Sequence, residues 1–556
     1  MNVISLAMNL RGKLIFEPHL EKYSKKPAET QTVLLLKLVE ENKDTEFGKD
    51  HNFESIKSVE DFRKNVPIAE YKDLFPYVER LINGETNILT HDEPVLFALT
   101  SGSTGVPKHI PITPTYVKDY SNVATLWFYN IIKDHPTAYD GKIFSPMPSP
   151  SDEKTKGGIP LGTISGHVQK NLPGFVLSHY VLKEDYLRGI EDYETIYYVW
   201  ARFGIEADVS TSIMVNPATH ILFAERGNDF REDIINDIET GKIKADLPIP
   251  EETRTLIEST LKPNPTRAAE LRKIVAEKGE LMPKDYWPNQ VLVVCWKSSS
   301  MGTFIPHLKR YYGNVAVRDA GYSGTEGRYC TPLQDDGAHG VINGDIYFYE
   351  FIPEANMDDD NPPVLLAHEV ELDRNYSLII TSANGLWRYN VNDVVRIVGY
   401  YNKTILIEFI HKGQGYSSLT GEKLSEWQVL KAVHDIADEM NLEVRMILVK
   451  GEKQELQHYN FYVGFTETPS PSEQTQFAHR VDVSMQDMNI EYKKRRDTDR
   501  LAPPQLIIID GKKVHDAYYS LKKSHGLHDA QMKFPVLITD YNDKDFNELK
   551  KQGILD

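Results

Sequence analysis

The sequence contains little cysteine and no long apolar run. Only two of its 556 residues are cysteines, Cys295 and Cys330, too few for a disulfide framework or for a zinc site built from cysteine alone. No run of roughly 18 apolar residues is present, so we expect no membrane-spanning helix. The N-terminal residues are mildly apolar, but Arg11 and Lys13 follow them rather than precede them, which argues against a signal peptide. These absences favour a cytoplasmic protein without a membrane partner.

Positive charge is scarce relative to negative charge. The chain has 63 Lys and Arg residues against 81 Asp and Glu residues, a formal net charge of -18. Proteins that bind a phosphate backbone carry basic faces, so we expect no nucleic-acid partner. The hydrophobic fraction of 40% is ordinary for a globular protein, and the chain is longer than one core usually organises. We therefore expect at least two domains.

The most informative segment is residues 100–108, with two glycines, four hydroxyl side chains and one lysine. Apolar residues 95–99 and the proline-bearing residues 109–113 predict strands on either side, so the segment is expected to be a loop between two strands. Glycines let backbone N–H groups turn toward an anion, and the hydroxyls and Lys108 add donors and charge. The segment favours a polyphosphate site, and a polar hairpin loop without function is the alternative.

A second glycine-rich turn, residues 320–327, contains Glu326 and follows a strand predicted at 315–317. A glutamate in such a turn is well placed to hold a divalent cation, and a tight turn with an incidental acid is the alternative. Neither glycine-rich segment fits a better-known motif. Walker A loops need Gly before the lysine and Ser or Thr after it, where this chain has Pro107 and His109. A nucleophile elbow needs a last glycine where this chain has Thr325.

Two further residues are candidates for chemistry. Asp393 stands at the end of a turn predicted over residues 385–396, where its carboxylate can accept hydrogen bonds from both hydroxyls of a ribose. A turn-capping aspartate is the alternative. Lys533 stands alone in the apolar residues 531–535, and a surface lysine with its stem along apolar surface is the alternative.

Helical segments alternate with apolar strands along the chain, which predicts α/β layers. The clearest examples are helices within residues 1–90, a helix at 116–133 and a buried strand at 291–296. The sequence becomes polar and glycine-bearing near residues 412–424, as is typical of a hinge. We predict an N-terminal ATP- and acyl-binding domain over 1–412, a hinge over 413–424 and a mobile α+β domain over 425–556.

In their order, these motifs resemble those of the adenylate-forming superfamily and, within it, the GH3 family of acyl acid amido synthetases. Residues 100–108 are similar to the superfamily's phosphate loop, and residues 322–326 resemble the GH3 family's Tyr-Gly-Ser-Ser-Glu type motif. Residues 385–393 resemble Gly-Leu-Tyr-Arg-Tyr-Arg-x-Gly-Asp, and residues 349–353 are closer to this family than to acyl-CoA ligases. The resemblance implies a large domain of layered α/β sheets plus a β-barrel, followed by a small mobile domain.

The resemblance also implies a two-step reaction that uses ATP and Mg²⁺. A carboxylic acid is adenylated, and an amine, usually an amino acid, then takes the acyl group. Glu326 is implied to hold Mg²⁺ and Asp393 the ribose, and Lys533 to neutralise charge during adenylation. Lys423 matches a lysine near the amine site. The residues implied to bind the nucleotide are Ser101, Gly102, Ser103, Thr104, Gly105 and Lys108 for the phosphates, and Tyr322, Gly324 and Thr325 for adenine or the α-phosphate.

The chain departs from the family pattern at Asn390 and Asn392, where Arg and Gly are usual. This departure motivates one alternative, an inactive nucleotide-binding scaffold on the same fold. The other alternative is an acyl-CoA ligase, which shares the adenylation step. We expect the protein to be a monomer or a weak homodimer whose substrates are a small carboxylic acid and an amine.

Overall fold

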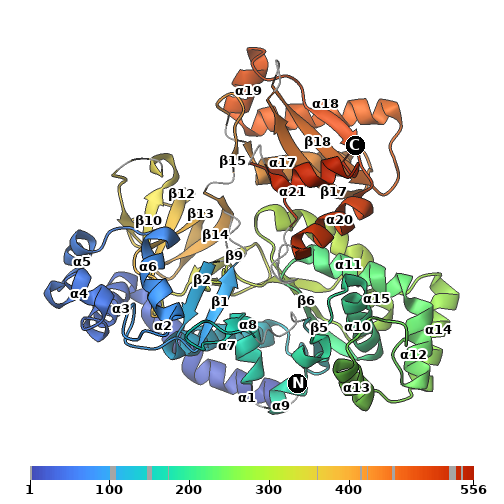
Figure 1. The fold of residues 1–556 in the computed structure, drawn as a ribbon, viewed down its shortest axis with the longest axis horizontal. Coiled ribbons are helices and arrows are strands. Elements are labelled where there is room, and N and C mark those ends of the chain that lie inside the picture. Colours follow the sequence, from blue (N-terminus) through green and yellow to red (C-terminus); the bar gives the residue numbers. More distant parts are fainter. Residues whose placement is uncertain are drawn as a thin grey trace. The chain divides into compact units, whose positions relative to one another are not determined.

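The computed structural model describes residues 3–100, 108–146, 153–172, 174–357, 359, 361–413, 416–422, 424–453, 457–524, 534–539 and 543–555. They form two compact units, Met1–Phe409 and Ile410–Asp556, whose elements are labelled in Figure 1. The hinge predicted over 413–424 begins just beyond this division and stays a prediction. None of the helices in the described ranges is long and apolar enough to cross a bilayer.

Unit 1 begins with helices, as the sequence predicts. Local signals start several of them: Thr45 and Ser58 cap α4 and α5 through their hydroxyls, and Glu70 and Asp73 form a reciprocal capping box on α6. The elements are α1 (Val3–Arg11), the π-helical turn η1 (Gly12–Phe16), α2 (Glu17–Lys25), α3 (Pro27–Glu41), α4 (Glu46–Asp50), the 3₁₀ turn η2 (Phe53–Ser55), α5 (Val59–Asn65) and α6 (Tyr71–Ile82).

The predicted pair of strands around the loop is confirmed. Strand β1 (Leu96–Thr100) runs antiparallel to β2 (Lys108–Ile112), with Thr100 opposite Lys108, and parallel to β4 (Leu161–Gly162). Helix α7 (Pro114–Asp134) begins immediately after β2, because Thr113 accepts a hydrogen bond from the N–H of Tyr116 and Pro114 fits the first helical position. Two short helices follow β4, α8 (Ile164–Lys170) and α9 (Gly174–Leu177).

A parallel sheet of four strands has the order β3-β5-β6-β7. Its strands are β3 (Lys142–Phe144), β5 (Val209–Ile213), β6 (Leu292–Cys295) and β7 (Ala316–Asp319). All four residues of β6 are buried, as expected for a continuous apolar run in a parallel sheet. The intervening elements are η3 (Glu184–Leu187), α10 (Tyr193–Glu206), α11 (Pro217–Asp229), α12 (Arg231–Thr240), α13 (Glu251–Thr260), α14 (Pro265–Lys278), α15 (Pro283–Tyr286), η4 (Ser299–Phe304) and α16 (Ile305–Tyr312).

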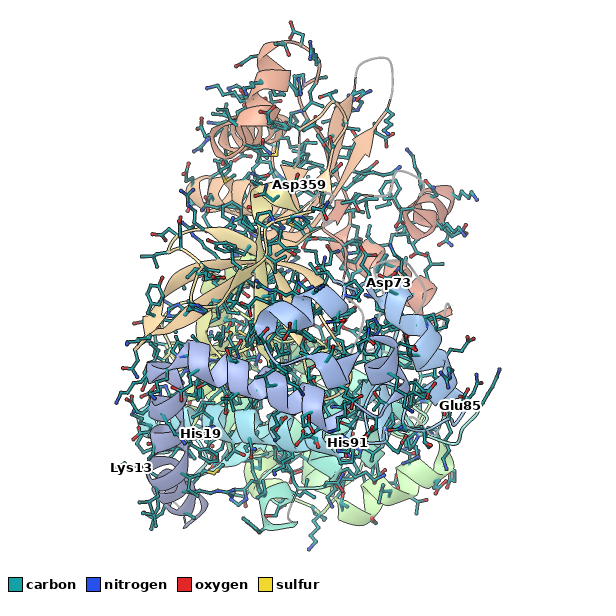
Figure 2. All side chains as sticks on the ribbon, turned by 90° about the vertical axis from the view of Figure 1, so that its left-hand side faces the viewer. Lys13, His19, Asp73, Glu85, His91 and Asp359 are labelled. Atoms are coloured by element: carbon teal, nitrogen blue, oxygen red, sulfur yellow. The ribbon has the colours of Figure 1, made fainter. Side chains whose placement is uncertain are left out.

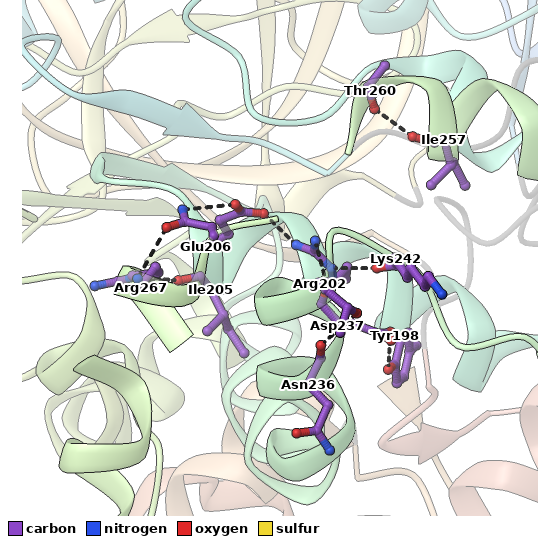
Figure 3. A network of polar contacts seen from close by, with 12 residues as sticks. Tyr198, Arg202, Ile205, Glu206, Asn236, Asp237, Lys242, Ile257, Thr260 and Arg267 are labelled. Carbon is purple, nitrogen blue, oxygen red and sulfur yellow. Dashed lines mark hydrogen bonds and ion pairs between the residues drawn. The ribbon is translucent and has the colours of Figure 1, made fainter. Parts of the chain in front are cut away.

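A buried arginine ties these helices together (Figure 3). Arg202 of α10 is fully buried and pairs with Glu206 one turn along the helix. Its remaining donors reach the backbone carbonyls of Lys242 (3.0 Å) and Asp237 (3.2 Å). The guanidinium is therefore satisfied within the fold, which is the arrangement that a structural buried charge requires.

The third sheet of unit 1 has seven strands in the order β11-β10-β12-β13-β14-β9-β8. They are β8 (Cys330–Thr331), β9 (His339–Ile342), β10 (Phe348–Pro353), β11 (Leu365–Leu366), β12 (Asn375–Thr381), β13 (Tyr389–Tyr401) and β14 (Thr404–Lys412), with η5 (Glu354–Asn356) after β10. One apolar core joins the N-terminal helices, β1, β2 and this sheet. The sequence placed Asp393 at the end of a turn, and this is wrong, because the residue lies inside β13.

Unit 2 is an α+β unit with a mixed sheet of order β19-β18-β17-β20. Residues 471–497 form two helices rather than one, because Asn489 leaves the helical conformation and caps the second one. The elements are β15 (Tyr416–Ser417), β16 (Leu424–Ser425), α17 (Glu426–Glu439), β17 (Val444–Glu452), β18 (His458–Phe465), α18 (Pro471–Met488), α19 (Ile490–Asp497), β19 (Gln505–Ile508), α20 (Gly511–Ser524), β20 (Leu537–Ile538) and α21 (Lys544–Lys551). The predicted fold class is confirmed.

Candidate active site

Lys108 is the first residue of β2 and enters the site from the hairpin. Its ammonium nitrogen donates a hydrogen bond to the hydroxyl of Tyr389 at 3.1 Å. It also lies 5.7 Å from the ring centroid of Tyr71 and 5.8 Å from that of Tyr389, within cation–π range. In the described ranges Lys108 forms no ion pair with a carboxylate. The predicted loop residues Ser101, Gly102, Ser103, Thr104 and Gly105 lie outside the described residues.

The turn that carries Glu326 follows β7. Its two sides meet in a bridge between Ser323 and Arg328, and the N–H of Gly324 donates to the carbonyl of Gly327 at 2.8 Å. A Cβ on Gly324 would lie 2.9 Å from Oε2 of Glu326, so the carboxylate folds back over the turn close to Gly324. Gly324 is exposed, whereas Thr325 and Glu326 are half-buried.

Asp393 and Tyr322 are both buried and joined to each other. The Tyr322 hydroxyl donates to Oδ2 of Asp393 at 2.6 Å, a short bond of the kind that a charged acceptor makes. The Tyr322 ring stacks on Phe409 of β14, with centroids 5.2 Å apart. Burial and then the charge of Asp393 raise the pKa of Tyr322 well above its ordinary value, so the tyrosine stays a neutral donor.

The charge of Glu326 acts on the same group of tyrosines. After burial, the largest cause that raises the pKa of both Tyr329 and Tyr389 is the charge of Glu326, and Asp393 adds to it in both. Two carboxylates therefore act on one set of tyrosine rings, and Lys108 bonds a member of that set. Glu326 has neither an ion pair nor a hydrogen bond to the described part of the chain. The structure thus brings together Lys108, Tyr322, Glu326 and Asp393.

The donor set at Glu326 fits a magnesium ion that is bound together with a nucleotide. Among the described residues no three His, Cys, Asp or Glu side chains gather closely enough to hold a metal by themselves. Mg²⁺ commonly takes one or two carboxylates and completes its shell with phosphate oxygens and water. One half-buried carboxylate suits that mode and does not suit an all-protein cage.

Arg388 and Glu350 form a separate buried pair that the sequence did not predict. Nε and Nη2 of Arg388 donate to the two carboxylate oxygens of Glu350 at 2.8 and 3.0 Å. Nη1 reaches the carbonyl of Val66 at 2.8 Å, and Arg63 adds a second arginine to the same carboxylate. In the sequence, the signal was a glutamate between the aromatic residues Tyr349 and Phe351, because such a charge is rarely buried without a partner.

The two asparagines that depart from the family pattern keep the local backbone geometry. Asn392 has φ of 59°, in the left-handed region that glycine adopts freely and that asparagine tolerates best among other residues. Its N–H donates to the side-chain oxygen of Asn390 at 2.9 Å, and Ser377 donates to the same oxygen at 3.5 Å. Asn392 therefore adopts the left-handed backbone conformation that glycine would adopt at this position.

The predicted lysines of unit 2, Lys423 and Lys533, lie outside the described residues. Glu422, next to Lys423, is buried and accepts bonds from the N–H groups of Leu419 and Thr420 and from the Tyr459 hydroxyl. Burial raises the pKa of Glu422, but these bonds outweigh it and the net pKa is lowered. The segment before Lys423 is therefore a fixed turn.

Comparisons with known proteins identify the fold and the family. The structure superposes on that of an acyl acid amido synthetase, AtGH3.15 in complex with 2,4-DB, with a TM-score of 0.84, 20% identity and coverage of 96% of this chain and 95% of the other. The chain belongs to the GH3 family. Sequence profiles of the family's N-terminal, central and C-terminal domains match residues 17–317, 340–412 and 427–542. The family resemblance expected from the motifs is confirmed.

Curated relatives carry the names of enzymes that act on different acids. Jasmonoyl–L-amino acid synthetase JAR4 of Nicotiana attenuata is 24% identical over 471 residues, which cover 81% of this chain and 78% of the relative. Indole-3-acetic acid-amido synthetase GH3.10 of Arabidopsis thaliana is 24% identical over 442 residues, with coverage of 73% and 72%. Because the two acids differ while the identity is equal, overall identity does not select an acid for this chain.

Proposed function

We propose that this chain is an ATP-dependent acyl acid amido synthetase. In the first half-reaction a carboxylate oxygen of the acid attacks the α-phosphorus of ATP, and pyrophosphate leaves. In the second, an amine nitrogen attacks the acyl carbon, loses a proton and displaces AMP. The products are an amide, AMP and pyrophosphate. An amino acid is the proposed amine, in line with the name of the Nicotiana relative.

The observation that carries the proposal is the grouping of Lys108, Glu326 and Asp393 around the same buried tyrosines. Lys108 is held by a neutral hydroxyl and by aromatic faces, so its charge stays available for an anion. The N–H groups and hydroxyls of residues 101–105, which precede Lys108 in the sequence, are proposed to bind the phosphates. Charge stabilisation and positioning are what a displacement at phosphorus needs most from a protein.

The remaining proposed roles follow from the chemistry of each group. Glu326 would hold Mg²⁺, which when bound neutralises phosphate charge. Asp393, oriented by the Tyr322 hydroxyl, accepts hydrogen bonds from the ribose hydroxyls. The turn that carries Glu326 also carries Tyr322, Gly324 and Thr325. These three residues are proposed to contact adenine or the α-phosphate. The buried, free cysteines Cys295 and Cys330 support a cytoplasmic enzyme.

Two lysines of unit 2 complete the proposal. Lys533 is proposed to neutralise charge that builds up during adenylation, and Lys423 to lie near the amine. Replacing Lys533 with alanine is expected to slow pyrophosphate exchange by about 10² or more, as loss of a transition-state donor does, while the Kd for ATP changes little. Equal exchange rates in variant and wild type would remove Lys533 from the mechanism.

Carboxylate-dependent ATP–pyrophosphate exchange tests the function directly. It is measured without amine over a panel of aryl, indolyl, alkyl and keto acids. Exchange with one acid class is expected and would identify the acyl donor. AMP release with that acid is then compared for a panel of amino acids and for coenzyme A.

The three outcomes separate the alternatives. AMP release with an amino acid and without thiol supports the proposal. Release that requires coenzyme A would make the chain an acyl-CoA ligase. Binding of ATP without exchange for any acid would contradict the proposal and favour the inactive scaffold.

A further inference from the structure

The N-terminal helices of unit 1 have one face fixed on the protein. Ser5 is fully buried, and a Cβ on Gly12 would lie 1.9 Å from the ring of Tyr129, so η1 lies directly on α7. Phe16 packs with Leu126 and Tyr129, while Leu20 and Tyr23 pack on Val341 of β9. The orientation of α1, η1 and α2 on the unit is therefore set, and so is the face that they turn outward.

The outward face of α1 and η1 carries large apolar side chains. Leu6, Leu10 and Leu14 recur at intervals of four residues, and their exposed fractions are 58%, 60% and 68%. Ile15 beside them is 53% exposed. Single exposed leucines are ordinary on a protein surface, but a continuous apolar stripe marks an interaction surface. We call these four residues the leucine face.

Cations border the leucine face although the protein is acidic. Residues 3–26 include five basic and two acidic residues, a formal charge of +3, whereas the whole chain has -18. Lys25 and Lys26 pair with Glu21 and Glu29. Arg11 and Lys13 are exposed and form no ion pair within the described part of the chain. Figure 2 labels Lys13 and His19 on these helices, at the outer edge of the view.

We propose that the leucine face attaches this protein to an anionic lipid surface. Helices that lie in the plane of a bilayer combine an apolar stripe with bordering Lys and Arg, which reach the headgroups. A second copy of the chain fits less well, because pairing two leucine faces brings Arg11 and Lys13 near the same cations of the partner. Attachment is peripheral and reversible, and it revises the expectation of no membrane partner. The inference does not depend on the proposed function.

Vesicle sedimentation of the full chain tests the proposal. The probes are sucrose-loaded vesicles of phosphatidylcholine alone and of phosphatidylcholine with about one third phosphatidylglycerol. We expect several-fold more protein to sediment with anionic vesicles, and this excess to fall when salt is raised from about 0.1 to about 0.5 M. Equal sedimentation with both vesicles, or none with either, would overturn the proposal without any variant.

Matched variants separate the two contributions. The double change Leu10→Ser and Leu14→Ser is expected to weaken binding to anionic vesicles about tenfold or more. The pair Arg11→Gln and Lys13→Gln is expected to weaken it about fivefold per charge and to remove the salt dependence. The controls are Leu372→Ser, at a residue 48% exposed elsewhere on unit 1, and Lys273→Gln, at a side chain 75% exposed.

Thermal unfolding of each variant checks that its fold is kept. Unchanged vesicle binding in both double variants would overturn the proposal. A dimer in sedimentation velocity that Leu10→Ser and Leu14→Ser dissolve would also overturn it, because the face would then be a contact between copies.

Discussion

Two buried polar clusters of unit 1 meet at adjacent residues of the chain. Arg388 and Glu350 satisfy each other's charge with two direct hydrogen bonds, and backbone carbonyls take the remaining donors. Tyr389, the next residue, belongs to the cluster of Lys108, Tyr322, Glu326 and Asp393, in which Lys108 donates to the Tyr389 hydroxyl and Asp393 accepts from the Tyr322 hydroxyl. Arg388 and Glu350 thus satisfy each other within the fold, whereas we propose that the second cluster receives a ligand.

The difference teaches how a fold divides its buried charge. A charge paired inside the protein contributes to structure and specificity, and its removal leaves its partner buried and uncompensated. A charge held by neutral groups keeps most of its interaction for a ligand, and folding depends on it less. The comparison therefore predicts large effects on stability from the Arg388 cluster and large effects on nucleotide binding from the Lys108 cluster.

The largest effect on stability is expected from Arg388→Met. This change leaves Glu350 buried with only Arg63, and we expect the free energy of unfolding to fall by about 3–5 kcal/mol in urea titrations. Arg396→Met is the matched control on the same strand, because Arg396 is half exposed and lies 3.5 Å from Asp373. The control should cost about 1 kcal/mol or less. Equal losses in the two variants would break the distinction between the clusters.

Glu326→Gln tests the role of Glu326 in the Lys108 cluster. Because the amide cannot replace a carboxylate as an anionic ligand for Mg²⁺, we expect the Mg²⁺ concentration for half-maximal pyrophosphate exchange to rise about tenfold or more. The unfolding free energy should change by less than about 1 kcal/mol, since Glu326 is half-buried and unpaired in the described residues. An unchanged Mg²⁺ titration would exclude the metal role.

Asn392 lies next to Asp393, and changes at Asn392 are expected to alter stability less than Arg388→Met does. Alanine tolerates the left-handed backbone region less well than asparagine does. Asn392→Ala, at φ of 59°, should therefore destabilise the protein by about 1 kcal/mol. Asn392→Gly should have the stability of the wild type to within about 0.5 kcal/mol. Alanine and glycine variants of equal stability would show that the left-handed backbone is not what this position requires.

Asp319 is expected to give the smallest effect, which depends on pH. It is buried at the end of β7. Burial raises its pKa to about 6, although hydrogen bonds from the N–H groups of Lys297 and Gly321 act to lower it. A raised carboxyl pKa means that the folded state binds the proton more tightly, so this stabilisation is present at low pH and is lost as pH rises through about 6. The stability difference between Asp319→Asn and wild type should shift by about 1 kcal/mol in favour of the variant between about pH 5 and about pH 7. A constant difference would contradict the raised pKa.

The sequence predicted the hairpin, the α/β layers and four residues, Lys108, Tyr322, Glu326 and Asp393, that the structure brings together. These features follow from local signals: prolines exclude a helix after residue 107, an apolar run forms β6, and glycines form the turn around Glu326. Each of these signals lies within a few residues of the feature that it forms. The fold class and the family could therefore be predicted from the sequence alone.

The remaining features depend on contacts between residues far apart in the chain. Asp393 was misplaced in a turn because Asn390 and Asn392 are turn-forming residues, and only pairing with β12 shows that β13 has already begun. The break at Asn489 interrupts an otherwise helical pattern through a side-chain cap. The joining of Arg388 with Glu350, and of Lys108 with Tyr389, spans 38 and 281 positions. No local pattern reports such pairings.

Titration calorimetry of MgATP into Lys108→Met tests the central claim most directly. The variant keeps the length of the side chain and removes a charge that, within the described part of the chain, contacts a hydroxyl and two ring faces and pairs with no carboxylate. The account predicts a Kd for MgATP at least about tenfold weaker than that of the wild type, with an unfolding midpoint that is unchanged. A wild-type Kd, or a variant that loses stability as Arg388→Met does, would show that the Lys108 cluster is a structural contact and not a nucleotide site.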